Sequence, residues 1–285
     1  MEVIPDLWPA LALTFGLFLL VGFFAQLIDG AVGMAYGVIS SSVLLAFGVP
    51  PAQASATIHA AECFTTGASG ASHLLHRNID WRLFWRLAPA GVVGGVAGAY
   101  LLTGFDPTFI KAVVIAYLGC LGVYMLYRAI RGLKEEPPHL NHVIPVGLIG
   151  GFLDASGGGG WGPVVSSTLM GRGHTPRYVI GSVNTAEFVV TVAISVTFIW
   201  TFLTGRFVFE GGVASGLAAL AGLILGGLVA APLAGYVTKI APARWLLAAA
   251  ALLVMGLSVW QGTQLWPRLL EYPVFNDVVR RSGLF

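Results

Sequence analysis

Seven apolar segments, each long enough to cross a lipid bilayer, follow one another along the chain. A transmembrane helix needs about 20 mostly apolar residues. The 285-residue sequence is 56% hydrophobic and only 10% charged, with a mean hydropathy of +0.83, so lipid has to cover much of its surface. We therefore predict an all-α polytopic membrane protein. Its expected spans are Leu7–Ile28, Ala52–His73, Leu83–Leu102, Thr108–Arg128, Tyr178–Leu203, Gly211–Val237 and Trp245–Gly262.

Three shorter apolar pieces lie between these spans. Gly33–Phe47 is marginal in length, and Val143–Leu153 and Trp161–Met170 are too short to span a membrane. The last two flank Gly157–Gly160, four consecutive glycines that a helix does not carry comfortably. We predict a hairpin of two half-helices that meet at these glycines inside the membrane. Irregular backbone is tolerated there only where protein buries it or where it lines a cavity.

The chain resembles itself when it is shifted by 125 residues. Eleven of the 38 positions from Asp29 to Thr66 match, against roughly three expected by chance. Because acids and prolines match as well as small residues, we predict an internal duplication. The matched pairs are Asp29/Asp154, Gly33/Gly158, Gly37/Gly162, Ser41/Ser166, Ser42/Ser167, Leu44/Leu169, Gly48/Gly173, Pro51/Pro176, Ala61/Ala186, Glu62/Glu187 and Thr66/Thr191.

The distribution of basic residues predicts the orientation, since cytoplasmic connections carry an excess of Lys and Arg. Four connections hold ten of the fifteen Lys and Arg residues, and placing them in the cytoplasm leaves the N-terminus outside. The corner at Pro50 then faces out and its repeat partner at Thr175 faces in, so the two repeats are inverted. We expect a first repeat at 1–130, a cytoplasmic connector at 131–142, a second repeat at 143–262 and an interfacial C-terminal tail at 263–285.

Four carboxylates lie in the predicted membrane segments, where an ionised group costs at least about 2.5 kcal/mol. Asp29 and Asp154 directly precede the glycine-rich breaks, a position from which a carboxylate caps the free N–H groups of a half-helix. Glu62 and Glu187 lie near the middle of their helices, and His59 precedes Glu62 by one turn. We predict that these last three residues line a translocation cavity or couple transport to protons, with a structural role as the alternative.

The breaks offer backbone groups to an anion. The N-terminus of a half-helix presents unpaired N–H groups and the positive end of a dipole, which attract an anion without Lys or Arg. Serine hydroxyls add donors, and Tyr36 and Trp161, at equivalent repeat positions, form cavity walls or pack in the core. The predicted substrate-binding residues are Gly33, Tyr36, Gly37, Ser41, Ser42, Gly157, Gly158, Gly159, Gly160, Trp161, Gly162, Ser166, Ser167 and Asn184.

Other sequence features give no indication of a metal site, a cofactor, a disulfide or nucleic-acid binding. The six histidines are scattered and the sequence has no P-loop, so we expect no metal, no cofactor and no ATP hydrolysis. Cys63 and Cys120 lie in apolar runs, where we expect them to remain unpaired. A net charge of +2 gives no indication of nucleic-acid binding. The expected partners are a small anionic substrate and the lipid bilayer, and the sequence is compatible with a homo-oligomer.

Four stretches resemble the TauE/SafE sulfite exporter family. They are Leu27–Gly37 (LIDGAVGMAYG), Gly48–Thr57 (GVPPAQASAT), His76–Arg82 (HRNIDWR) and Gly151–Pro163 (GFLDASGGGGWGP). The resemblance covers both halves, and it implies a permease of the cytoplasmic membrane that moves sulfite, a sulfonate or a related small anion. The first break has fewer glycines than the second, so the two breaks are not expected to bind substrate equally.

Four acids without a base are an unusual lining for an anion site. We therefore expect at least one of Glu62 and Glu187 to be neutral when the anion binds, because burial disfavours the ionised form. Release of its proton on the other side would couple transport to protons. In the alternative, the carboxylates bind a cation or proton directly in a carrier or a channel. A hydrolase built on Ser55, His59 and Glu62 is disfavoured, since neighbours on one helix face do not assemble a nucleophile, its base and an oxyanion hole. We expect a transporter and not an enzyme.

Overall fold

The computed structural model describes residues 7–131, 142–170, 176–209, 213–240 and 242–270. Within these ranges the regular structure is helical, without a strand. The elements are α1 (Leu7–Val32), α2 (Tyr36–Ala46), α3 (Pro51–Leu75), α4 (Trp81–Leu102), α5 (Pro107–Arg131), α6 (Val143–Gly157), the π-helical segment η2 (Gly162–Ser166), α7 (Ser167–Met170), α8 (Pro176–Leu203), α9 (Val213–Ile240) and α10 (Ala243–Leu270).

Five of the described helices, α1, α5, α8, α9 and α10, are long and apolar enough to cross a membrane. α3 and α4 are also long, with 25 and 22 residues, but they are less apolar. In α3 the reason is burial within protein, because Gln53, Ser55, His59 and Glu62 on this helix are all buried. The structure confirms an all-α polytopic membrane protein, and each of the seven predicted spans lies largely on one helix.

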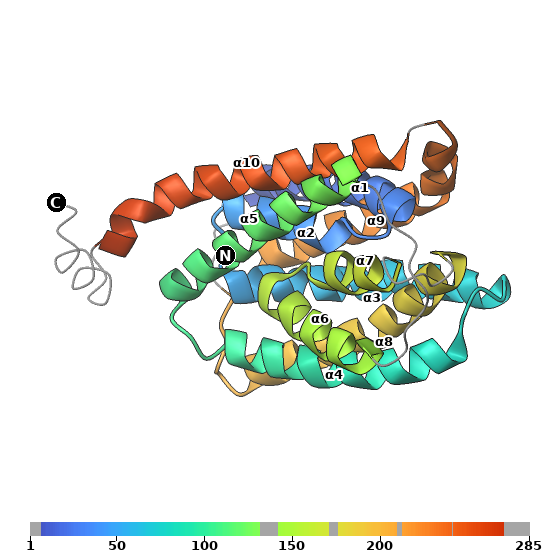
Figure 1. Ribbon diagram of the computed structural model, residues 1–285. Helices are drawn as coiled ribbons and strands as arrows, with labels where there is room; N and C mark the ends of the chain where they lie inside the picture. Colours follow the sequence, from blue (N-terminus) through green and yellow to red (C-terminus); the bar gives the residue numbers. More distant parts are fainter. Residues whose placement is uncertain (1–6, 132–141, 171–175, 210–212, 241, 271–285) are drawn as a thin grey trace, which may run out of the picture.

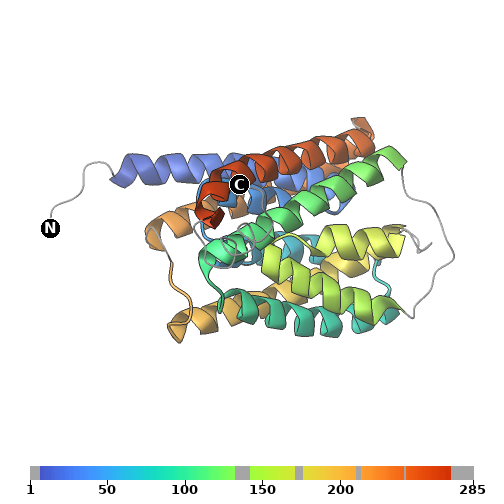
Figure 2. The ribbon, with the colours of Figure 1, turned by 60° about the vertical axis from the view of Figure 1, so that its left-hand side comes forward.

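The helices of one half pack mainly against helices of the other half. In chain order, α6 to α10 occupy the places of α1 to α5, and the most extensive contacts are α1 with α9, α4 with α6, α5 with α10, α4 with α8, and α3 with α8. The α1–α9 and α4–α6 contacts are equivalent, and α5–α10 and α3–α8 join equivalent helices. The α4–α8 contact has its equivalent in the smaller α3–α9 contact. α1, α5 and α10 lie on one side of the bundle and α4 and α6 on the opposite side (Figures 1 and 2). Reciprocal contacts of this kind are typical of two copies related by a two-fold axis.

Glycines bring the backbones of the paired helices into contact. A Cβ atom on Gly94 of α4 would collide with the carbonyl oxygen of Leu148 in α6. In the equivalent pair, a Cβ on Gly226 of α9 would collide with the carbonyl oxygen of Leu19 in α1. Small residues at helix interfaces are a common basis of packing in membranes, where lipid removes most of the hydrophobic driving force.

The predicted connector and the predicted C-terminal tail lie partly outside the described residues. α10 runs without interruption through residue 262 to Leu270, so the expected start of the C-terminal tail is not a helix boundary. Leu265 and Leu269 of this continuation pack with Ile115 of α5. Residues 271–285 of the expected interfacial tail and 132–141 of the expected connector lie outside the described ranges.

Replacement of Gly94 by alanine should destabilise the fold. The added methyl group has no space against the Leu148 carbonyl, and overpacking of this kind costs about 1–3 kcal/mol. Gly256→Ala is the matched control, because its Cβ would meet nothing within 4 Å and alanine favours a helix by about 1 kcal/mol over glycine. Thermal unfolding in detergent should show a lower transition temperature for Gly94→Ala alone. Equal transition temperatures would contradict the packing described for α4 and α6.

Candidate functional site

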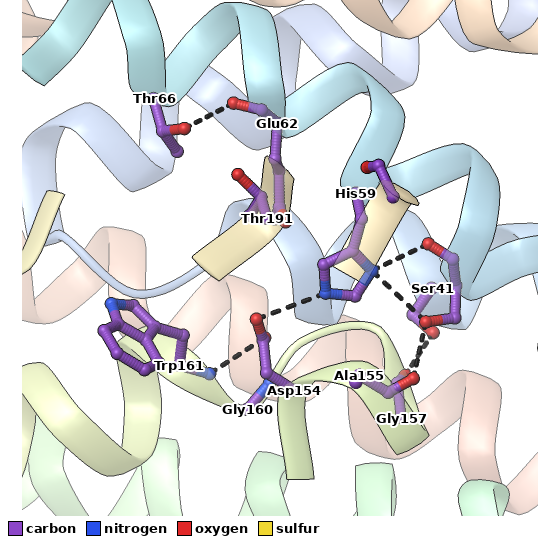
Figure 3. A network of polar contacts seen from close by, with 12 residues as sticks. Ser41, His59, Glu62, Thr66, Asp154, Ala155, Gly157, Gly160, Trp161 and Thr191 are labelled. Carbon is purple, nitrogen blue, oxygen red and sulfur yellow. Dashed lines mark hydrogen bonds and ion pairs between the residues drawn. The ribbon is translucent and has the colours of Figure 1, made fainter. Parts of the chain in front are cut away.

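Each broken helix carries an aspartate that caps the segment after the break. Oδ1 of Asp29 accepts hydrogen bonds from the N–H groups of Ala35 and Tyr36, at 2.7 and 3.1 Å. Oδ1 of Asp154 accepts from the N–H groups that lie six and seven residues further along, at 2.7 and 2.9 Å (Figure 3). The spacing between acceptor and donors is the same in both halves. The capping geometry expected for the two aspartates is thus present at both breaks.

The two breaks meet with backbone against backbone. A Cβ on Gly37 would lie 2.8 Å from the carbonyl oxygen of Gly158 and from Cα of Gly159. A Cβ on Gly162 would lie 2.5 Å from Cα of Met34. Gly162 is the repeat partner of Gly37, and Gly159 is the repeat partner of Met34. Each break therefore makes the same contact with the other break. Only glycine permits this approach, which explains why glycine recurs at these positions.

The tetraglycine stretch lies inside the protein. Gly157 to Gly160 are all buried, and Gly158 has a φ of 69°, in the left-handed region that ends helix α6. The ring of Tyr117 from α5 lies so close to Gly157 that a Cβ there would collide with it. A Cβ on Gly160 would lie 2.5 Å from the Tyr117 hydroxyl oxygen. The second break is therefore enclosed by α5 as well as by the first break.

A cavity of about 540 Å³ lies beside the contact between the breaks. Both breaks, α3 and α8 contribute to its wall, and all four membrane carboxylates line it. No Lys or Arg is among the described residues of this wall, so the cavity is strongly acidic. The predicted site residues that line it are Asp29, Gly33, Tyr36, Gly37, Glu62, Asp154, Gly159, Gly162, Asn184 and Glu187.

The other predicted binding residues lie outside the cavity lining. The Ser41 hydroxyl donates to the carbonyl oxygen of Gly157 at 2.6 Å and so joins the two breaks. The Ser167 hydroxyl donates to the Pro163 carbonyl oxygen. Serines in helices commonly bond to backbone carbonyls in this way, which takes these hydroxyls away from a substrate. The remaining residues of this group are Ser42, Ser166, Gly157, Gly158, Gly160 and Trp161, all of them buried.

The two aromatic residues at the repeat position differ in their surroundings. Trp161 is fully buried, and its Nε1–H donates to the carbonyl oxygen of Val183 at 3.3 Å. Tyr36 lines the cavity, and its hydroxyl donates to the carbonyl oxygen of Leu223 in α9 at 3.1 Å. Trp161 therefore packs in the core, whereas Tyr36 connects α2 to α9 at the cavity wall.

His59 lies between the two halves. Its Nδ1 is 2.7 Å from the carbonyl oxygen of Ser55, and its Nε2 is 3.2 Å from Oδ2 of Asp154 (Figure 3). A carbonyl oxygen only accepts hydrogen bonds, so Nδ1 carries a hydrogen atom. The Ser55 hydroxyl donates to the carbonyl oxygen of Ala155 at 2.6 Å. This hydroxyl is committed to the backbone of α6, unlike the nucleophile of a hydrolase.

Glu62 completes a buried acid–base cluster. One ligand atom from each of His59, Glu62 and Asp154 lies within 4.8 Å of the others. Oε2 of Glu62 is buried and has no hydrogen-bond partner among the described residues. In this arrangement Nε2 of His59 and Oδ2 of Asp154 form a hydrogen bond, and Oε2 of Glu62, unpaired among the described residues, lies nearby.

Residues 18–260 match the family model described as "Sulfite exporter TauE/SafE". The chain belongs to the TauE/SafE sulfite exporter family. It is 39% identical over 233 residues to "Probable membrane transporter protein YtnM" of Bacillus subtilis (strain 168), covering 78% of this chain and 74% of that protein. It is 27% identical over 157 residues to "Probable membrane transporter protein" of Haemophilus influenzae (strain ATCC 51907 / DSM 11121 / KW20 / Rd), covering 53% and 61% respectively. No solved structure matches the chain significantly. These findings identify a multi-pass membrane permease.

The cavity of this TauE/SafE protein also contains polar residues that sequence analysis missed. Thr65 and Ser69 line it, three and seven residues after Glu62 on α3, and helical spacing from Glu62 would have indicated both. The Nδ2 amide of Asn184 donates to the Ser69 hydroxyl at 2.9 Å. Gln26, three residues before Asp29 on α1, lines the cavity as well. Thr65, Ser69 and Gln26 each share a helix face with a carboxylate.

Cysteine labelling should separate lining residues from buried ones. In a variant with Cys63 and Cys120 changed to alanine, Ser69→Cys should react with a water-soluble thiol reagent, because this position lines the cavity. Ser42→Cys should react at least about tenfold more slowly, since thiol reactivity depends on access and Ser42 is fully buried. Mass spectrometry of the labelled protein measures both rates. Similar rates at both positions would contradict the assignment of the cavity wall.

Proposed function

We propose that the chain is a secondary transporter that moves a small sulfur-containing anion, such as sulfite or an organosulfonate, across the cytoplasmic membrane. The observation that carries the proposal is that both half-helices after the breaks begin at one cavity, since Gly37 of α2 and Gly162 of η2 line the same wall. The substrate class is supported by the name of the matching family. The driving force is an ion gradient, without a cofactor.

Uncharged donors would bind the anion. The first N–H groups of a helix have no acceptor within the helix, and each aspartate cap occupies two of those at its break. The next N–H groups of α2 and η2 belong to Gly37, Val38 and Gly162, all of which line the cavity. Together with the positive ends of two helix dipoles, they give an anion site that needs no Lys or Arg.

Proton coupling resolves the conflict between an anionic substrate and an acidic cavity. A protonated carboxyl group no longer repels an anion, and it gains an O–H donor that can bind the substrate. Glu62 and Glu187 are the mid-helix acids of the lining, so we assign the coupled proton to them. Release of this proton on the far side of the membrane weakens the site and frees the anion.

The proposed transport cycle uses two inverted repeats that rock against each other around the breaks. The reciprocal contacts of α1 with α9 and of α4 with α6 support two equivalent halves. The inversion and a N-terminus outside the cytoplasm follow from the distribution of Lys and Arg, and the repeat boundaries remain those expected from the sequence. A homo-oligomer is compatible with this arrangement.

A second candidate is a carrier or channel for cations or protons. The acidic lining without Lys or Arg among its described residues favours this function, because carboxylates bind cations directly. Two measurements distinguish the anion transporter from a cation carrier or channel. Sodium or potassium should compete with sulfite only if the cation uses the anion site. Saturable counterflow without conductance indicates a carrier and not a channel.

Replacement of Glu62 and Glu187 together by glutamine should abolish the pH dependence of anion transport. The amides preserve size and cannot exchange a proton, so uptake of labelled sulfite, thiosulfate or a small sulfonate into liposomes should no longer respond to a pH gradient. We expect the response of the wild-type protein to fall by at least about tenfold, within the range of typical coupling energies.

Asp106→Asn is the control, because Asp106 is an exposed cap at the start of α5 and lies outside the cavity lining. If the double variant keeps both the rate and its pH dependence, the proposed role of the glutamates is wrong. If the wild-type protein moves none of the three anions, the proposed substrate class is wrong.

A further inference from the structure

The two breaks share their caps but differ in one chemical property. Oδ2 of Asp154 is 3.2 Å from Nε2 of His59, which can gain and lose a proton. The repeat partner of His59 is Asn184, whose amide donates to the Ser69 hydroxyl and does not titrate. The second break is therefore attached to a titratable side chain of the first repeat, and the first break has no equivalent attachment through Asn184.

The hydrogen count of the His59–Asp154 pair follows from its contacts. Nδ1 of His59 holds the hydrogen that it donates to the Ser55 carbonyl oxygen. If Nε2 had no hydrogen and Asp154 were ionised, two acceptors would face each other in a buried site, where an unsatisfied polar group is costly. In the arrangement of the structure, one proton therefore lies between Nε2 and Oδ2, bonded to one of the two atoms.

We propose that His59 and Asp154 form a proton-binding site that controls the second break, and that Glu62 exchanges the proton with it. Glu62 is suited to this exchange because its Oε2 is buried without a partner among the described residues and the three side chains lie within 4.8 Å. In the transfer, the N–H or O–H bond of the pair breaks and an O–H bond forms on Glu62. The pair loses one positive charge, and Glu62 becomes neutral. The inference rests on the proposed function. It assigns the coupled proton of that function to a route through the His59–Asp154 pair and Glu62.

The control over the break follows from the two oxygens of Asp154. Oδ1 accepts the N–H groups of Gly160 and Trp161 at the start of the second half-helix, while Oδ2 faces His59. Hydrogen bonds to an ionised acceptor are about twice as strong as those to a neutral one, so the location of the proton alters the cap. Other titratable groups that face the cluster are Cys63 of α3, Asp29 of α1, Tyr36 of α2, Tyr117 of α5 and Glu187 of α8.

The first test needs no substrate. We would measure the unfolding temperature of the full-length protein in lipid nanodiscs as a function of pH. A proton that the pair binds only in the folded state makes the unfolding temperature depend on pH. Asp154→Asn keeps an oxygen for the cap and offers an N–H to Nε2, so it has no proton to lose.

The matched control is Asp29→Asn, which changes the equivalent cap of the first break. Because Glu62 and Glu187 are titratable groups beside the pair, both are changed to glutamine in the parent for this comparison. His59→Asn and Asp154→Asn should each reduce the pH dependence of the unfolding temperature, and the double variant should reduce it no further than either single variant, because the two side chains share one proton. The effect of Asp29→Asn should instead add to that of His59→Asn. An unchanged profile in His59→Asn, or additive effects of His59→Asn and Asp154→Asn, would overturn the proposal.

The second test measures coupling in liposomes, with sulfite as the probe. The readout is the ratio of accumulation driven by a pH gradient to counterflow at equal pH, which moves no net proton. Asp154→Asn should lower this ratio by at least about tenfold, whereas Asp29→Asn should change both rates in parallel. A wild-type ratio in Asp154→Asn would overturn the coupling role. If the wild-type protein does not move sulfite, the proposed function fails on that substrate, and the unfolding profiles still decide whether the proton site exists.

Discussion

The structure depends on how two interrupted helices satisfy their backbone N–H groups away from water. Inside a membrane protein, each unpaired N–H group costs free energy that lipid cannot offset. Asp29 and Asp154 supply the acceptors with the same spacing in both halves. Because a carboxylate oxygen accepts two N–H groups at once, one side chain stabilises each break. The cost is a pair of acids within the membrane, Asp154 buried and Asp29 half-buried, and both line the cavity.

The contact between the breaks explains why their glycines come in repeat-related pairs. Gly37 meets Gly159, and Gly162 meets Met34, each with no room for a side chain. The helices outside the breaks follow the same principle, because α1 packs on α9 as α4 packs on α6.

The sequence was sufficient to predict the apolar spans, the two breaks and the aspartates beside them, because length, composition and repetition are local properties. It did not distinguish cavity residues from buried ones. Ser41 and Trp161 lie next to the breaks but bond to backbone carbonyls of the opposite half or of α8, and only the rotation of each half-helix decides that. The His59–Asp154 contact joins residues 95 positions apart, and no spacing rule within one helix predicts it.

The acidity of the cavity limits what any mechanism can do. Two like charges 4 Å apart repel by about 4 kcal/mol at an effective dielectric constant of 20, and His59, Glu62 and Asp154 lie within 4.8 Å of one another. With both acids ionised and His59 neutral, an anion entering beside them would meet a second repulsion of similar size. A proton on the cluster removes one negative charge. Asp154, which caps the second break, belongs to this cluster. The acid that holds this break therefore also makes the affinity for an anion dependent on protonation, so a fold capped in this way is suited to coupling an anion to a proton.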